Sequence, residues 1–148
     1  MKRTKRTKRT KTRRKTKTKT NKMKQTNQII VQTFLQLLNM IKLYHWKTHI
    51  YAQHIATDEL YTKLNEHIDK FVEILLGKNE NRIYMTEHHL QLYDAANDSQ
   101  IKQKIYQCRF FLEQMNDCFD KNKDSDLLSI RDDILADINQ FLYLMTFR

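Results

Sequence analysis

Residues 45–76 read HWKTHIYAQHIATDELYTKLNEHIDKFVEILL, and this stretch decides how the chain folds. Its apolar residues recur every three or four positions, which is the spacing of one face of an α-helix. The whole chain of 148 residues has no Pro and a single Gly. Because β-sheet folds need those residues in their many turns, we expect an all-α protein. The length predicts one domain with a buried core.

Four segments with an apolar stripe predict four helices, at about residues 25–48, 51–76, 98–119 and 127–147. Gly77 directly follows the second segment and is a typical helix C-cap. The residues expected on the stripes are Ile30, Phe34, Leu37, Leu38, Ile41, Tyr61, Leu64, Ile68, Val72, Leu75, Ile101, Ile105, Cys108, Leu112, Met115, Phe119, Ile130, Ile134, Ile138, Phe141, Leu142 and Met145. Stripes of this kind predict a four-helix bundle.

The second and third predicted helices are separated by the polar stretch 78–97. Its length predicts a long crossover connection between them, with a candidate short helix at 84–93. Cys108 and Cys118 stand at helical spacing among apolar residues, so we expect buried, reduced thiols rather than a disulfide or metal ligands. Reduced thiols indicate a reducing compartment.

Five residues in the first two helices have the chemistry and spacing of metal ligands. His54 and Asp58 are four positions apart, as are Asp69 and Glu73, so each pair projects from one helix face. Asp58 and Asp69 are about 16 Å apart along the axis, too far to share one ion. His45 continues the stripe of the first helix and should point inward. The spacing therefore predicts two half sites that two subunits would complete for each other. The alternative is a core histidine and a solvated acidic face.

Residues 1–24 form a basic segment, with fourteen Lys and Arg and no acidic residue. Residues 25–148 carry a net charge of −4, so the +10 of the whole chain comes from this segment. It has almost no apolar residues and its charges repel each other, which predicts a disordered tail. Such tails bind polyanions by displacing counterions. The residues expected to bind nucleic acid are Lys2, Arg3, Lys5, Arg6, Lys8, Arg9, Lys11, Arg13, Arg14, Lys15, Lys17, Lys19 and Lys22.

The basic segment has a second interpretation as an organelle transit peptide, because such peptides are also rich in Arg and hydroxyl groups and free of acids. A transit peptide needs an amphipathic apolar face, which residues 1–22 lack. No apolar run reaches the ~20 residues of a membrane span, and none follows the basic residues as in a signal peptide. We expect a cytoplasmic protein with no membrane partner.

Four motifs, taken together, resemble one known family. They are His45-Trp46, His54-x3-Asp58, Glu66-His67-x-Asp69-x3-Glu73 and Asp137-x3-Phe141-Leu142. In their order and spacing they make residues 24–148 similar to Dps, the ferritin-like DNA-binding protein of starved cells. The resemblance implies a ferritin-like four-helix bundle at 25–148 and a homo-oligomer, a closed twelve-subunit shell. The chain departs from the family in its shorter link between His45 and His54, in Ile74 where the family has Arg, and in its longer tail.

The resemblance also implies a ferroxidase that oxidises Fe(II) with peroxide or oxygen, with iron as its metal. His45, His54 and Asp58 of one subunit would face Asp69 and Glu73 of another, and all five would be metal ligands and catalytic. The basic tail would bind and compact DNA regardless of sequence, so the protein would be associated with a nucleoid, or with the genome in a virion. One alternative is a chromatin-like DNA-packaging protein that keeps the bundle without iron chemistry. Another is a helical interaction protein whose tail binds RNA or an acidic partner.

Overall fold

The computed structural model describes the backbone of residues 5–85 and 89–147, and side chains from Gln25 onward. These residues form only helices and connections, which confirms the all-α prediction for this part of the chain. The helices are α1 (Lys5–Lys47), α2 (Tyr51–Asn79), α3 (Asp98–Gln114), the 3-10 helix η1 (Met115–Asp117) and α4 (Ser125–Leu144).

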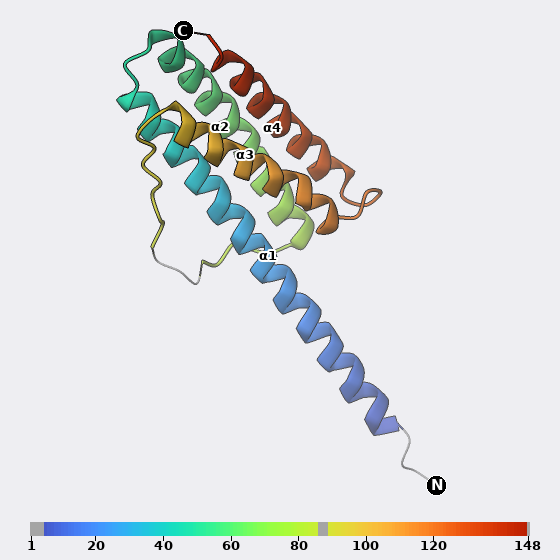
Figure 1. Ribbon diagram of the computed structural model, residues 1–148. Helices are drawn as coiled ribbons and strands as arrows, with labels where there is room; N and C mark the ends of the chain where they lie inside the picture. Colours follow the sequence, from blue (N-terminus) through green and yellow to red (C-terminus); the bar gives the residue numbers. More distant parts are fainter. Residues whose placement is uncertain (1–4, 86–88, 148) are drawn as a thin grey trace.

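The helix α1 begins at Lys5 instead of near Gln25. The disorder predicted for 1–24 is therefore not seen over residues 5–24, while residues 1–4 lie outside the described part. No Pro or Gly interrupts residues 5–24, so the backbone can continue the helix that starts the bundle. Figure 1 shows this basic part of α1 projecting well beyond the other helices.

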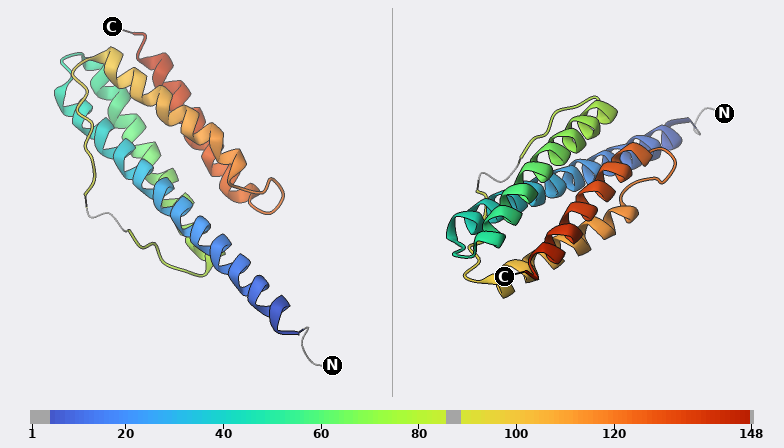
Figure 2. Two further views of the ribbon diagram at one scale, coloured as in Figure 1. Left: turned by 60° about the horizontal axis from the view of Figure 1, so that its bottom comes forward. Right: turned by 90° about the horizontal axis from the view of Figure 1, so that it is seen from above.

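The other helices and the remainder of α1 pack as a four-helix bundle. The main contacts join α1 to α2, α2 to α4, α4 to α3, and α3 back to α1, which closes a ring around one core. Figure 2 shows the α1–α2 pair lying against the α3–α4 pair. All the predicted stripe residues of α1 are buried in this core, as are most of those of α2, α3 and α4.

The connection from α2 to α3 runs back along α1. It starts near Gln28, whose side chain donates to the carbonyl of Tyr84. It then reaches the far end of α1, where the Lys47 ammonium lies 2.6 Å from Asp94 Oδ1. As a result α3 begins at the same end of the bundle as α2, as Figure 1 also shows. The described parts of 84–93 contain no helix, contrary to the candidate short helix, and residues 86–88 of it lie outside the description.

Two helix ends differ from the prediction. Gly77 does not cap α2, because the helix continues to Asn79 and Glu80 adopts the left-handed conformation with φ 47° instead. The α3 helix ends at Gln114, and η1 takes Cys118 out of the helical register. Cys118 is consequently exposed and free, contrary to the predicted buried thiol, while Cys108 is partly buried and also free.

Arg131 was not anticipated as a core residue, yet its side chain is buried. Its guanidinium donates to the carbonyl of Leu112 at 2.8 Å and to Asn116 Oδ1 at 3.0 Å, and its Nε donates to Asp132 Oδ1 at 2.7 Å. The carbonyl of Leu112 lies in the last turn of α3, where it also accepts from the backbone N–H of Met115. Arg131 therefore ties the C-terminal end of α3 to α4.

Candidate functional site

His45 lies in the last turn of α1 and is 8% exposed, which confirms that it points inward. Its Nδ1 is 3.0 Å from the carbonyl oxygen of His54 and 3.2 Å from Thr57 Oγ1. In return, His54 Nδ1 is 3.1 Å from the carbonyl oxygen of His45. Because a carbonyl oxygen can only accept, each Nδ1 carries the proton and donates it. In this tautomer of a neutral imidazole it is Nε2 that keeps the lone pair with which histidine binds metals.

The two imidazole rings stack on each other, with centroids 3.9 Å apart and planes inclined by 22°. His45 Nε2 also lies 3.8 Å from Asp58 Oδ1. The structure thus brings together the three residues predicted for the first half site, His45, His54 and Asp58. Both His54 and Asp58 are exposed, so the half site opens outward on α2 while His45 closes it from the core side.

A buried polar network supports this corner between α1 and α2. The Gln53 carboxamide oxygen accepts from Tyr44 Oη at 2.8 Å and from Thr48 Oγ1 at 2.9 Å, and its Nε2 lies 3.3 Å from Asp98 Oδ2. Burial, and then the Asp98 carboxylate, raise the pKa of the Tyr44 phenol, which keeps it a donor. Thr57 is fully buried beneath His45. Sequence reasoning missed Gln53 and Thr57, although both lie on the core side of α2.

Lys42 is a second residue that the sequence reasoning missed. Its ammonium lies 3.3 Å from Asp58 Oδ1. It also lies 4.8 Å from the ring centroid of Tyr61 and 6.0 Å from that of Trp46. The sequence did contain a signal for Lys42, because it lies about one helical turn before His45 on the same helix. A positive charge therefore stands beside the carboxylate of the half site.

Asp69 and Glu73 lie further along α2, and both are exposed. They are not brought to the first half site within one chain. Among the described residues, neither carboxylate has a hydrogen-bond or ion-pair partner, and no group of three or more His, Cys, Asp or Glu could hold a metal ion. One chain thus presents the neighbouring residues His45, His54 and Asp58, which form no metal-holding group by themselves within the described residues, and a separate, open pair of carboxylates.

Three large apolar or aromatic side chains that are near the first half site in the sequence are exposed. Trp46 is 68% exposed, Tyr51 78% and Ile55 40%. A contiguous exposed apolar patch can mark a contact with another molecule. Trp46 is not part of the core of the single chain.

The other histidines that the structure describes lie away from the proposed half sites. His67 Nδ1 pairs with Asp137 Oδ2 at 2.8 Å in the seam between α2 and α4. His49 and His89 are exposed, and His88 lies outside the described residues.

The predicted nucleic-acid ligands from Lys5 to Lys22 lie along the projecting part of α1, and Lys2 and Arg3 precede the described residues. Among the described helices, none has the length and hydropathy needed to cross a bilayer.

No curated protein and no solved structure matches the chain. The sequence model of a family of unknown function matches residues 45–145, from the first candidate ligand in α1 to just beyond the end of α4. All five candidate ligands lie inside the matched region, and the basic segment lies outside it. Since the match covers most of the chain, the protein belongs to this family of unknown function (DUF5856).

Proposed function

We propose that the protein is a Dps-like miniferritin, which oxidises Fe(II) at sites shared between two subunits and binds DNA through its basic segment. The observation that carries the iron proposal is the reciprocal hydrogen bonding of His45 and His54. Histidines that bind metals almost always donate their other ring N–H to a carbonyl or carboxylate, which fixes the ring and its tautomer. Here both rings are fixed in this way next to a carboxylate, with His54 exposed and His45 buried on the core side.

The donor set suits Fe(II) as a substrate. His45, His54 and Asp58 would come from one subunit, and Asp69 and Glu73 from its partner. Imidazole suits iron, and carboxylates suit hard divalent ions. In the proposed reaction two Fe(II) ions each give one electron to one peroxide, which takes up two protons and leaves as two waters. This two-electron route releases no hydroxyl radical.

The arrangement of the helices supports a ferritin-like reading of the bundle. Ferritin-like bundles have one long crossover. In this chain the connection between α2 and α3 runs along the bundle part of α1, from the contact of Tyr84 with Gln28 to the ion pair of Asp94 with Lys47. The exposed apolar corner next to the half site supports an assembly in which a second copy covers it, and closed symmetric oligomers are the common form.

The basic segment supports DNA as the second ligand. It carries fourteen positive charges on a chain whose remainder has net charge −4. Its repeated Lys-Arg-Thr and Lys-Thr units offer charge without the varied side chains that read base edges, so we propose binding that ignores sequence. Several such segments on one assembly would bind DNA jointly and condense it. The protein would then be associated with the genome, in a nucleoid or a virion.

Fe(II) oxidation tests the iron proposal. The full chain is mixed with Fe(II) and a stoichiometric amount of peroxide without oxygen, and Fe(III) formation is followed by ultraviolet absorbance. We expect oxidation far faster than in buffer, with one peroxide consumed for two Fe(II). A rate equal to that in buffer would contradict the ferroxidase proposal.

A DNA-packaging protein without iron chemistry is the second candidate. It is favoured by the Lys42 ammonium beside Asp58 and by the lack of a three-ligand group in the described residues. If Fe(II) is not oxidised while DNA is condensed, this function replaces the first. Preferential binding of RNA over DNA across a salt titration would favour the third alternative, a helical interaction protein.

A further inference from the structure

One carboxylate oxygen of the half site faces two different groups. Asp58 Oδ1 lies 3.3 Å from Lys42 Nζ and 3.8 Å from His45 Nε2. A divalent ion bound to this oxygen would sit about 2.0–2.2 Å from it. An ammonium and a divalent cation cannot occupy such neighbouring positions without strong repulsion, because the interaction of two charges grows as their distance falls. A cation that binds Asp58 Oδ1 would therefore have to displace the Lys42 ammonium from its position.

Two aromatic rings hold the Lys42 ammonium at this position. Tyr61 on α2 and Trp46 on α1 present their rings to it at 4.8 Å and 6.0 Å. A cation over an aromatic face is attracted by the ring quadrupole. The ammonium is therefore held by a carboxylate and two rings together. The side chain still has a way out, because 29% of it is exposed and its stem is long and flexible.

We propose that Lys42 is a positioning residue that serves as the internal counter-cation of the half site. It neutralises Asp58 in the metal-free subunit and withdraws to solvent when a divalent ion binds. This inference rests on the proposed function, because it concerns the same site. A lone half site then offers only two imidazoles and a carboxylate already paired with Lys42. The completed site gains two carboxylates, Asp69 and Glu73 of the partner, and their negative charge favours the exchange of Lys42 for the ion.

The test measures Co²⁺ binding to the full chain by calorimetry, with Co²⁺ as an air-stable probe of the same charge. Quenching of the single tryptophan, Trp46, provides a second readout at the site. Lys42→Met should bind Co²⁺ at least about tenfold more tightly than the native chain, since it removes a like charge from the ion's position. Lys42→Arg keeps the charge and should bind Co²⁺ as weakly as the native chain.

Lys47→Met is the matched control. Lys47 also lies near the end of α1, but its ammonium pairs with Asp94 at 2.6 Å instead of with Asp58. Its removal changes the net charge equally and should leave Co²⁺ affinity unchanged. Where Asp58→Asn is already present, Lys42→Met should give a much smaller gain, because the oxygen for which the two cations compete is then uncharged. Light scattering and circular dichroism check that all variants assemble and fold like the native chain. If Lys42→Met fails this check, Lys42→Gln takes its place.

The outcomes separate the two proposals. If the native chain binds Co²⁺ and Lys42→Met binds it equally or less tightly, Lys42 is not the counter-cation, while the metal site stands. An equal gain in Lys47→Met would show a general charge effect and would also overturn the inference. Binding by Lys42→Met alone supports the inference and shows that Lys42 silences the native site. Binding by neither chain overturns the ferroxidase proposal, and the inference with it.

Discussion

His45 and His54 each donate the Nδ1 proton to the other's backbone carbonyl, at 3.0 Å and 3.1 Å, with their rings stacked 3.9 Å apart. These two hydrogen bonds can form because α1 ends at Lys47 and α2 begins at Tyr51. The short corner between them brings the last turn of α1 against the first turn of α2. Both rings are ordered before any ligand arrives. A site prepared in this way loses little side-chain entropy on binding.

The first prediction concerns the proposed ligands. Asp58→Asn and Glu73→Gln remove an anionic donor from different halves of the site, so each should slow peroxide-driven Fe(II) oxidation at least about tenfold. The matched control is His67→Ala, because the His67 ring is engaged with Asp137 at 2.8 Å, away from both halves. Stopped-flow absorbance gives the rates. A His67 variant as slow as Glu73→Gln would show that the losses come from the fold instead of the ligands.

The second prediction concerns assembly. The two halves lie about 16 Å apart on one helix, so a working site needs a twofold-related copy of the chain. Light scattering should therefore show at least a dimer at micromolar concentration, and by resemblance a twelve-subunit shell. Tyr51→Asp should shift the protein toward smaller species, because Tyr51 is 78% exposed beside the half site. Its helix content should stay native. A stable native monomer would exclude the shared site.

The third prediction concerns the basic segment. Deleting residues 1–22 removes thirteen of the fourteen positive charges that precede residue 25 and leaves a body that repels phosphate, so binding to duplex DNA should be lost. For the full chain, engaging about half of the charges predicts a log–log salt slope of roughly −6. Fluorescence anisotropy with two unrelated duplexes measures both. Equal affinity of the truncated and the full chain would show that the bundle, and not the segment, binds DNA.

The spacing of the apolar residues was enough to predict the bundle. Helices such as α1 and α4 pack where their apolar stripes become buried, and the stripes can be read from the sequence. The spacing was also enough to predict that His45 faces inward, since the residue continues a stripe whose members Ile30, Phe34 and Ile41 are all buried. Composition misled at the N-terminus. Like charges argue against packing, but they do not stop a backbone free of Pro and Gly from continuing α1 back to Lys5.

The polar details could not be predicted, because they depend on which helices meet. Lys42 reaches Asp58 only because α1 and α2 lie side by side, and Arg131 is buried only because its donors meet the end of α3. Cys118 was misplaced for a local reason, since η1 breaks the helical period that the prediction assumed. It remains a prediction that Asp69 and Glu73 face another subunit.

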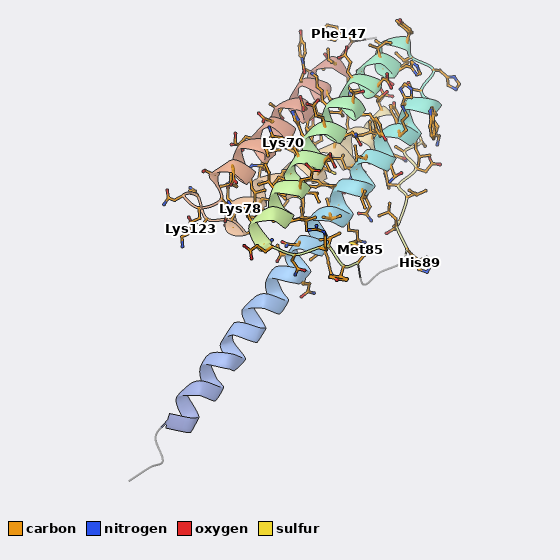
Figure 3. The ribbon with its side chains drawn as sticks, turned by 180° about the vertical axis from the view of Figure 1, so that it is seen from behind. Lys70, Lys78, Met85, His89, Lys123 and Phe147 are labelled. Carbon is orange, nitrogen blue, oxygen red and sulfur yellow. The ribbon has the colours of Figure 1, made fainter. Side chains whose placement is uncertain are left out.

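The fourth prediction concerns Lys78, which ties the end of α2 to the turn before α4. Its ammonium contacts the carbonyl of Lys123 at 2.6 Å, Asp126 Oδ1 at 2.7 Å and Asp124 Oδ1 at 3.2 Å. Figure 3 shows Lys78 and Lys123 at the end of the bundle from which α1 projects. The Asp126 contact raises the pKa of Lys78, and the Lys78 contact lowers the pKa of Asp126. The ion pair therefore stabilises the fold only while both groups are charged.

The lowered pKa of Asp126 means that its contribution is lost as pH falls below about 4, the usual range of Asp. The raised pKa of Lys78 means that its contribution is lost only above about pH 10.4, the usual value of Lys. Lys78→Met should thus have a slightly lower Tm than the native chain at pH 7, and the difference should shrink below pH 4. Lys70→Met, an exposed position on α2, is the control. A difference that is equal at pH 7 and pH 3 would contradict the ion-pair explanation.

The fifth prediction concerns the two thiols. Burial raises the pKa of Cys108 to about 11, so at pH 8 roughly one Cys108 in a thousand carries the reactive thiolate. Cys118 is exposed. A disulfide reagent at pH 8 should therefore modify one thiol per chain quickly and the second only after unfolding in guanidinium. Cys118→Ser should remove the fast phase and Cys108→Ala the slow one. A thiol that stays buried and protonated cannot attack the reagent. Two fast phases in the native chain would therefore mean that the seam between α3, which carries Cys108, and α1 opens readily.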